Sequence, residues 1–167
     1  MRLPLKSFSV LLFGFLILTG CVKNDTTVYE TPDDLVAAAK AEVKSIGMEE
    51  LKALIDSHAK IQIVDCREDY DYMLGHIPGS IHIPRGVLEF SDKLSNRRVK
   101  TLVLGNEMGS GALAVQTLEL LKYSNCYLLD FSWFDWEGAY PELVEQGMGN
   151  AQPEAPKKKE SSGGCGG

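Results

Sequence analysis

The first group of residues that could do chemistry lies between positions 61 and 84. Asp65 and Arg67 follow a short apolar run, and His76 lies in the segment Gly75-His76-Ile77-Pro78-Gly79, which has the composition of a turn. A guanidinium can bind a carboxylate through two parallel hydrogen bonds, so Asp65 and Arg67 could form an ion pair that ties the strand to the turn. Ion-pair networks are common at such junctions without catalysis. We therefore interpret these three residues as a structural motif.

A second candidate site is the glycine-rich segment Gly105-Asn106-Glu107-Met108-Gly109-Ser110-Gly111. It follows the apolar run 101–104, which is typical of a buried strand, and it precedes a predicted helix. Backbone N–H groups in such a loop can bind a small anion or a peptide carboxylate. The alternative is that the loop only connects the strand to the helix. The spacing of a dinucleotide-binding motif is absent, and we predict neither a cofactor nor a bound metal.

The elements that must position these residues alternate along the chain. We predict strands at 44–46, 61–64, 81–83, 101–104 and 126–129, and helices at 47–57, 86–94 and 112–122. A further helix is predicted to begin at Thr31-Pro32-Asp33-Asp34, and it should pack on the domain through residues at helical spacing, Leu35, Val36, Ala39 and Val43. This alternation predicts an α/β fold with a mainly parallel sheet and helices on both faces.

The segment from Asp65 to Pro84 contains Asp-x-Arg-Glu-x-x-Tyr, then Gly-His-Ile-Pro-Gly-Ser and Ile-Pro. This order of residues resembles the first signature of the rhodanese-like (sulfurtransferase) domain family, and the resemblance covers roughly residues 43–143. It implies a three-layer domain with a central sheet of about five strands, here preceded by an additional N-terminal helix. It also implies that strand 101–104 lies centrally, between strands 61–64 and 126–129.

In active members of that family, the loop after the central strand begins with a nucleophilic cysteine, whose thiolate is stabilised by the loop amides. Here Gly105 stands at that position, and a shift of one residue would place Asn106 there. The arginine near the end of the loop is replaced by Ser110 or Gly111, and Glu107 adds a negative charge. We therefore predict no catalytic residue and a degenerate domain that binds a ligand or a protein partner. The alternative is a thiosulfate or persulfide sulfurtransferase that uses a displaced thiol, Cys165 or Cys66.

The remaining cysteines and the aromatic segment 131–141 complete the predicted site. Cys66 and Cys126 would lie two strands apart, a gap of about 10 Å, so we expect two separate buried thiols. Phe131 and Ser132 replace two glycines of the family pattern, and their added bulk is expected to fill the pocket. The neighbouring aromatic residues are interpreted as core and pocket lid, with a partner surface as the explanation if they are exposed together: Trp133, Phe134 and Trp136.

Residues 1–20 are predicted to be a lipoprotein signal peptide. Arg2 and Lys6 precede an apolar run over 8–18 that is short for a membrane span. Leu18-Thr19-Gly20-Cys21 resembles a bacterial lipobox, so we expect acylation of Cys21, with palmitate among the chains, and membrane lipid as its partner. A plain membrane anchor is the alternative. Val22 is not the aspartate that typically marks inner-membrane retention, which favours the periplasmic face of an outer membrane.

The predicted organisation is a tether and helix over 21–42, the domain over 43–146 and a disordered tail over 147–167. The full chain has 17 basic and 23 acidic residues, and residues 1–20 hold two of the basic ones. The mature chain would therefore be strongly acidic, which argues against nucleic acid as a partner. A small anion or a protein of the cell envelope is the expected partner.

Overall fold

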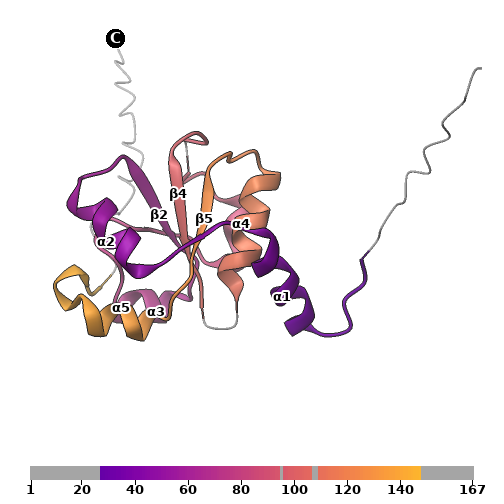
Figure 1. Ribbon diagram of the computed structural model, residues 1–167, viewed down its shortest axis with the longest axis horizontal. Coiled ribbons are helices and arrows are strands. Elements are labelled where there is room, and N and C mark those ends of the chain that lie inside the picture. The colour runs from indigo at the N-terminus through magenta and orange to yellow at the C-terminus, as the bar shows by residue number, and fades with distance from the viewer. Residues whose placement is uncertain (1–26, 95, 107–108, 148–167) are drawn as a thin grey trace, which may run out of the picture.

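The computed structural model describes residues 27–94, 96–106 and 109–147 (Figure 1). The predicted signal peptide, Cys21, Glu107, Met108 and the tail with Cys165 lie outside the described residues. No helix in the described part is long and apolar enough to cross a membrane.

The centre of the domain is a five-stranded sheet with the order β1-β5-β4-β2-β3, in which every pairing is parallel. The strands are β1 (Ser45–Ile46), β2 (Ile61–Asp65), β3 (Ile81–His82), β4 (Lys100–Leu104) and β5 (Cys126–Leu129). The predicted central place of β4 between β2 and β5 is confirmed. Its residues from Thr101 to Leu104 are all buried, as expected of a strand covered on both faces.

Helices cover the two faces of the sheet and make two separate hydrophobic cores (Figure 1). One face carries α1 (Pro32–Glu42), α4 (Ser110–Leu120) and the 3₁₀ helix η1 (Arg85–Phe90). The other carries α2 (Met48–Asp56) and α5 (Trp133–Ala139), near α3 (Asp69–Leu74) and the 3₁₀ helix η2 (Pro141–Leu143). The three-layer α/β fold predicted for the domain is therefore confirmed.

The helix α1 begins where the sequence indicates. Thr31 caps it, since the Asp34 N–H donates to the Thr31 hydroxyl at 3.2 Å and the Thr31 N–H donates to the Asp34 carboxylate at 3.1 Å. Ala39 is buried against the core. Leu35, however, is 37% exposed, so the prediction that it packs on the domain is wrong. Of the four apolar residues at helical spacing, only some therefore face α4 and the sheet.

Two predicted boundaries on the same face are also corrected. The segment 86–94, predicted as a helix, forms the 3₁₀ helix η1 only to Phe90, because Ser91 has an extended backbone. The helix predicted over 112–122 already begins at Ser110. Gly109 precedes it with a φ of 87°, a left-handed conformation that glycine adopts without strain. The loop after β4 is therefore shorter than the sequence indicates.

Candidate functional site

The Asp65–Arg67 ion pair forms at the carboxyl end of β2 and is almost wholly buried, with 0% and 4% of these residues exposed. The Arg67 guanidinium donates to both Asp65 carboxylate oxygens, at 2.6 Å from Nη2 and 3.0 Å from Nε, and Nη2 also donates to the Gly75 carbonyl at 2.7 Å. The indole of Trp133 covers the guanidinium, with 4.1 Å between Cζ and the ring centroid. These bonds tie the strand to the turn, as predicted.

His76 belongs to the same buried structure. Its Nδ1 lies 3.0 Å from the Tyr72 carbonyl, and its ring stacks on the Tyr72 ring at 3.9 Å. The other face of Tyr72 stacks on His82 at 4.2 Å, and His82 in turn contacts the Arg67 carbonyl. The imidazoles therefore hold α3 and the following turn on the end of β2. This packing supports a structural role for the motif.

The loop after β4 is closed by hydrogen bonds between its own ends. The Asn106 N–H donates to the Ser110 hydroxyl at 2.9 Å, and the Ser110 N–H donates to the Asn106 side-chain oxygen at 3.2 Å. The Gly109 N–H donates to the Asn106 carbonyl at 3.1 Å. These three amides, which the sequence suggested for anion binding, already have acceptors within the loop. Glu107 and Met108 lie outside the described residues.

Gly105 is packed so tightly that it has no room for a side chain. A Cβ atom built on it would lie 2.1 Å from the Gly111 nitrogen and 2.5 Å from the Gly111 Cα. Gly111 is also confined, though less so, since its Cβ would lie 2.7 Å from a methyl carbon of Leu128. The two glycines thus let the first turn of α4 approach the end of β4 directly. A cysteine at position 105 would need the backbone to move.

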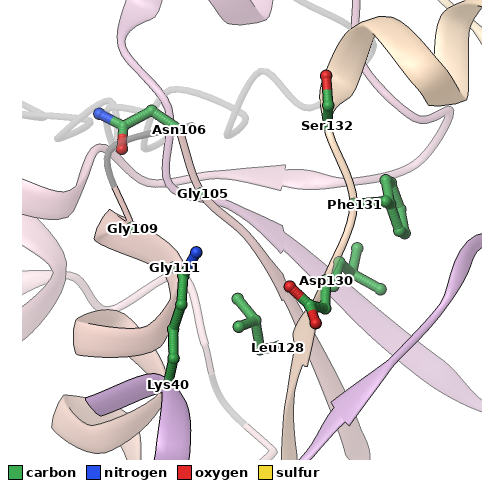
Figure 2. Close-up of a pocket in the computed structure, with 10 residues that line it drawn as sticks. Lys40, Gly105, Asn106, Gly109, Gly111, Leu128, Asp130, Phe131 and Ser132 are labelled. Carbon is green, nitrogen blue, oxygen red and sulfur yellow. The ribbon is translucent and has the colours of Figure 1, made fainter. Parts of the chain in front are cut away.

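A cavity of about 330 Å³ remains beside this loop, at the ends of β4 and β5 (Figure 2). Its lining residues come from α1, the loop and the segment after β5: Lys40, Gly105, Asn106, Gly109, Gly111, Leu128, Leu129, Asp130, Phe131 and Ser132. The Phe131 ring points away from Lys40 and stacks on Trp136 at 5.5 Å (Figure 2). The prediction that Phe131 and Ser132 fill the pocket is therefore wrong, because both residues line a cavity that remains open.

A second cavity, of about 690 Å³, adjoins the first and shares four lining residues with it: Gly105, Asn106, Phe131 and Ser132. Arg67 of the buried ion pair and Trp133 form part of its wall, and the exposed residues Leu74 and Phe134 also line it. The predicted core and lid role holds for Trp136, which is fully buried, and for Trp133 over Arg67. Phe134 is not a core residue, since it is 71% exposed, but it also lines the second cavity.

The two cysteines that the structure describes are separate buried thiols, as predicted. Burial raises the pKa of the Cys66 thiol to about 12 and that of the Cys126 thiol to about 11. Neither lines a cavity described above. A thiolate is the reactive form of cysteine, so this environment makes both poor nucleophiles.

Sequence reasoning missed two residues of the first cavity, Lys40 and Asp130. Lys40 comes from α1, and Asp130 directly follows β5. One signal was present for Asp130, because ligands in parallel sheets bind beyond the carboxyl ends of the strands. Nothing in the local sequence marks Lys40, whose place depends on how α1 docks.

Residues 47–139, more than half of the chain, match the sequence profile of the rhodanese-like domain. The chain belongs to the rhodanese-like domain family. It is similar to a candidate sulfur carrier protein of Bacillus subtilis, YrkF, with 26% identity over 96 residues that cover 58% of this chain and 52% of the relative. The chain thus spans about half the length of that protein.

Solved structures of the family show the same fold. A rhodanese-like domain protein from Staphylococcus aureus has a TM-score of 0.54 at 25% identity, over 62% of this chain and 97% of that one. A thiosulfate sulfurtransferase from Pseudomonas aeruginosa has a TM-score of 0.55 at 25% identity, over 71% of this chain and 23% of that one. The rhodanese-like domain described here therefore has sulfurtransferase homologues.

Proposed function

We propose that the chain is a lipid-anchored, catalytically degenerate rhodanese-like domain that binds a partner in the cavities beside Gly105. The packing of Gly105 carries this proposal. Because Gly105 has no side chain, the backbone of Gly111 packs directly against it and occupies the space that a cysteine side chain would need. The two open cavities that Gly105 lines would still accept a ligand. The partner predicted from the sequence was a small anion or an envelope protein.

Sulfur transfer tests the loss of catalysis. The full chain, purified in detergent, is incubated with thiosulfate and cyanide, and thiocyanate is measured. We expect no turnover above the rate without protein. Robust turnover by the full chain would contradict a degenerate domain.

The anchor is proposed at Cys21 and lies outside the described residues. The lipobox-like sequence supports it, and the proposed location is the periplasmic face of an outer membrane if the organism has one. Mass spectrometry of the chain expressed in bacteria should show a start at Cys21 with acyl chains attached, and Cys21→Ser should abolish both. An unmodified Cys21 in an uncut chain would refute the anchor.

Sulfur transfer by a displaced thiol is the second candidate, and the similarity to a candidate sulfur carrier favours it. Burial of Cys66 leaves Cys165 as the better thiol for this role. Alkylation with iodoacetamide between pH 6 and 9 distinguishes the two functions. A sulfur-transferring Cys165 should react well below its usual pKa of about 8.5, whereas an ordinary thiol should not. Loss of any observed turnover in Cys165→Ser would support this second function.

A further inference from the structure

Lys40 and Asp130 bring opposite charges to opposite sides of the cavity beside Gly111 (Figure 2). The Lys40 ammonium lies near the first turn of α4, and the Asp130 carboxylate lies across the cavity at the end of β5 (Figure 2). Within the described part of the chain, neither side chain has an ion-pair or hydrogen-bond partner, and the two do not pair with each other. Both charges are therefore available to a ligand.

The wall between these charges is apolar and comes from Leu128, which is only 6% exposed. The positive end of α4, an eleven-residue helix, adds to the field of Lys40 on its side of the cavity. The loop amides of Asn106, Gly109 and Ser110 already have acceptors, so they offer little to a phosphate or sulfate. A simple anion would also be repelled by Asp130, and a simple amine by Lys40.

We propose that this cavity binds a small α-amino acid in its zwitterionic form. Its carboxylate would face Lys40 and the start of α4, its ammonium would face Asp130, and its side chain would contact Leu128. The volume of about 330 Å³ is at the lower end of the range of small-molecule sites, which suits a ligand of this size. The inference rests on the proposed binding function and specifies its ligand class.

Lys40 lies outside the part of the chain that matches the family, which begins at residue 47. The helix α1 holds it in place, because Ala39 is buried in the core and Val36 packs close to Gly109. The proposed site thus joins a residue of α1 to residues of the matched domain.

Isothermal titration of the full chain in detergent tests the proposal, with L-alanine and L-leucine as probes. Propionate and ethylamine are the matched comparisons, because each is alanine without one of its two charged groups. We expect saturable binding of at least one amino acid, and binding of propionate and ethylamine weaker than that of alanine by at least about tenfold, equivalent to about 1.4 kcal/mol. Lys40→Met and Asp130→Asn should each weaken binding by a similar factor.

Lys60→Met is the matched control, since Lys60 is exposed and lines neither cavity, and it should bind as the unmodified chain does. Methionine and lysine have similar helix propensities, so Lys40→Met should leave α1 folded, which circular dichroism verifies. The proposal is overturned if neither amino acid binds, if propionate binds as tightly as alanine, or if both charge-removing variants retain full affinity. Absence of amino-acid binding leaves the proposed degenerate domain standing, whereas thiosulfate turnover rejects the degenerate domain whether or not an amino acid binds.

Discussion

Restoring a side chain at position 105 tests whether the loop has closed over the place of the family cysteine. We consider Gly105→Ala and Gly105→Cys, which add the same Cβ atom and differ by the thiol. In both variants this atom would meet the nitrogen and Cα of Gly111, at 2.1 and 2.5 Å. Both contacts are with backbone at the start of α4, so a rotamer change cannot relieve them.

The expected loss of stability depends on which part of the fold must move to relieve the clash. Relief of the clash requires the start of α4 to shift away from the end of β4. Over-packing a core costs about 1–3 kcal/mol. A clash between the added Cβ and backbone atoms belongs at the upper end, so we expect a loss of about 3 kcal/mol in the free energy of unfolding. Gly86→Ala is the matched control, because a Cβ there has no neighbour within 4 Å.

Urea unfolding followed by tryptophan fluorescence measures these values. The control should remain within about 0.5 kcal/mol of the unmodified chain or gain slightly, since it removes only the freedom of a glycine in the unfolded state. Gly105→Cys should also fail to transfer sulfur from thiosulfate to cyanide. A Gly105→Ala chain as stable as the unmodified one, or an active and stable Gly105→Cys chain, would show that the closed loop has been misinterpreted.

Four further predictions concern stability and the burial of the two thiols. Arg67→Met leaves the Asp65 carboxylate buried without its partner, so the free energy of unfolding, measured in urea, should fall by about 3–5 kcal/mol. Adding Asp65→Asn should recover part of this loss. An Arg67→Met chain with no loss of stability would refute the role of the pair. Cys66 and Cys126 should resist iodoacetamide at pH 8.5 in the folded chain and react in urea, and rapid labelling without urea would argue against their burial. Above pH 9 the unfolded Cys66 thiol loses its proton while the folded one keeps it to about pH 12, so the free energy of unfolding should fall in this window, and less steeply in Cys66→Ala. Gly138→Ala, inside α5 with nothing within 4 Å of the added atom, should raise that free energy by about 0.5–1 kcal/mol, and a decrease would contradict an open environment.

Local sequence was sufficient where the interacting groups are near neighbours or where the chain is uniformly apolar. Asp65 and Arg67 are two residues apart at a strand end, so their pairing could be predicted from the chain alone. The strand over 101–104 could be predicted from its apolar run, which is typical of a strand covered on both faces, and the structure extends it to Lys100. The order of the strands depended on the resemblance to a known family.

The errors concern the face that each side chain presents. Leu35 has the spacing of a packed residue but lies on the exposed side of α1, because only some of the apolar residues at helical spacing reach α4. Phe131 was expected to fill the pocket, yet its ring stacks on Trp136 and leaves the cavity open. Both outcomes depend on how separate elements dock, which the period of a single helix or strand does not specify.

The sequence by itself determined that a glycine, without a thiol, follows the central strand, and that a carboxylate and a guanidinium meet at the neighbouring strand end. The tertiary structure alone decided that Gly111 occupies the space a side chain would need at Gly105, and that Lys40 faces Asp130 across a cavity. The physical reason is how far apart in the sequence the interacting residues lie. Adjacent residues are held together by the covalent chain, whereas residues far apart in sequence meet only after α1, α4 and β5 have packed together around one core.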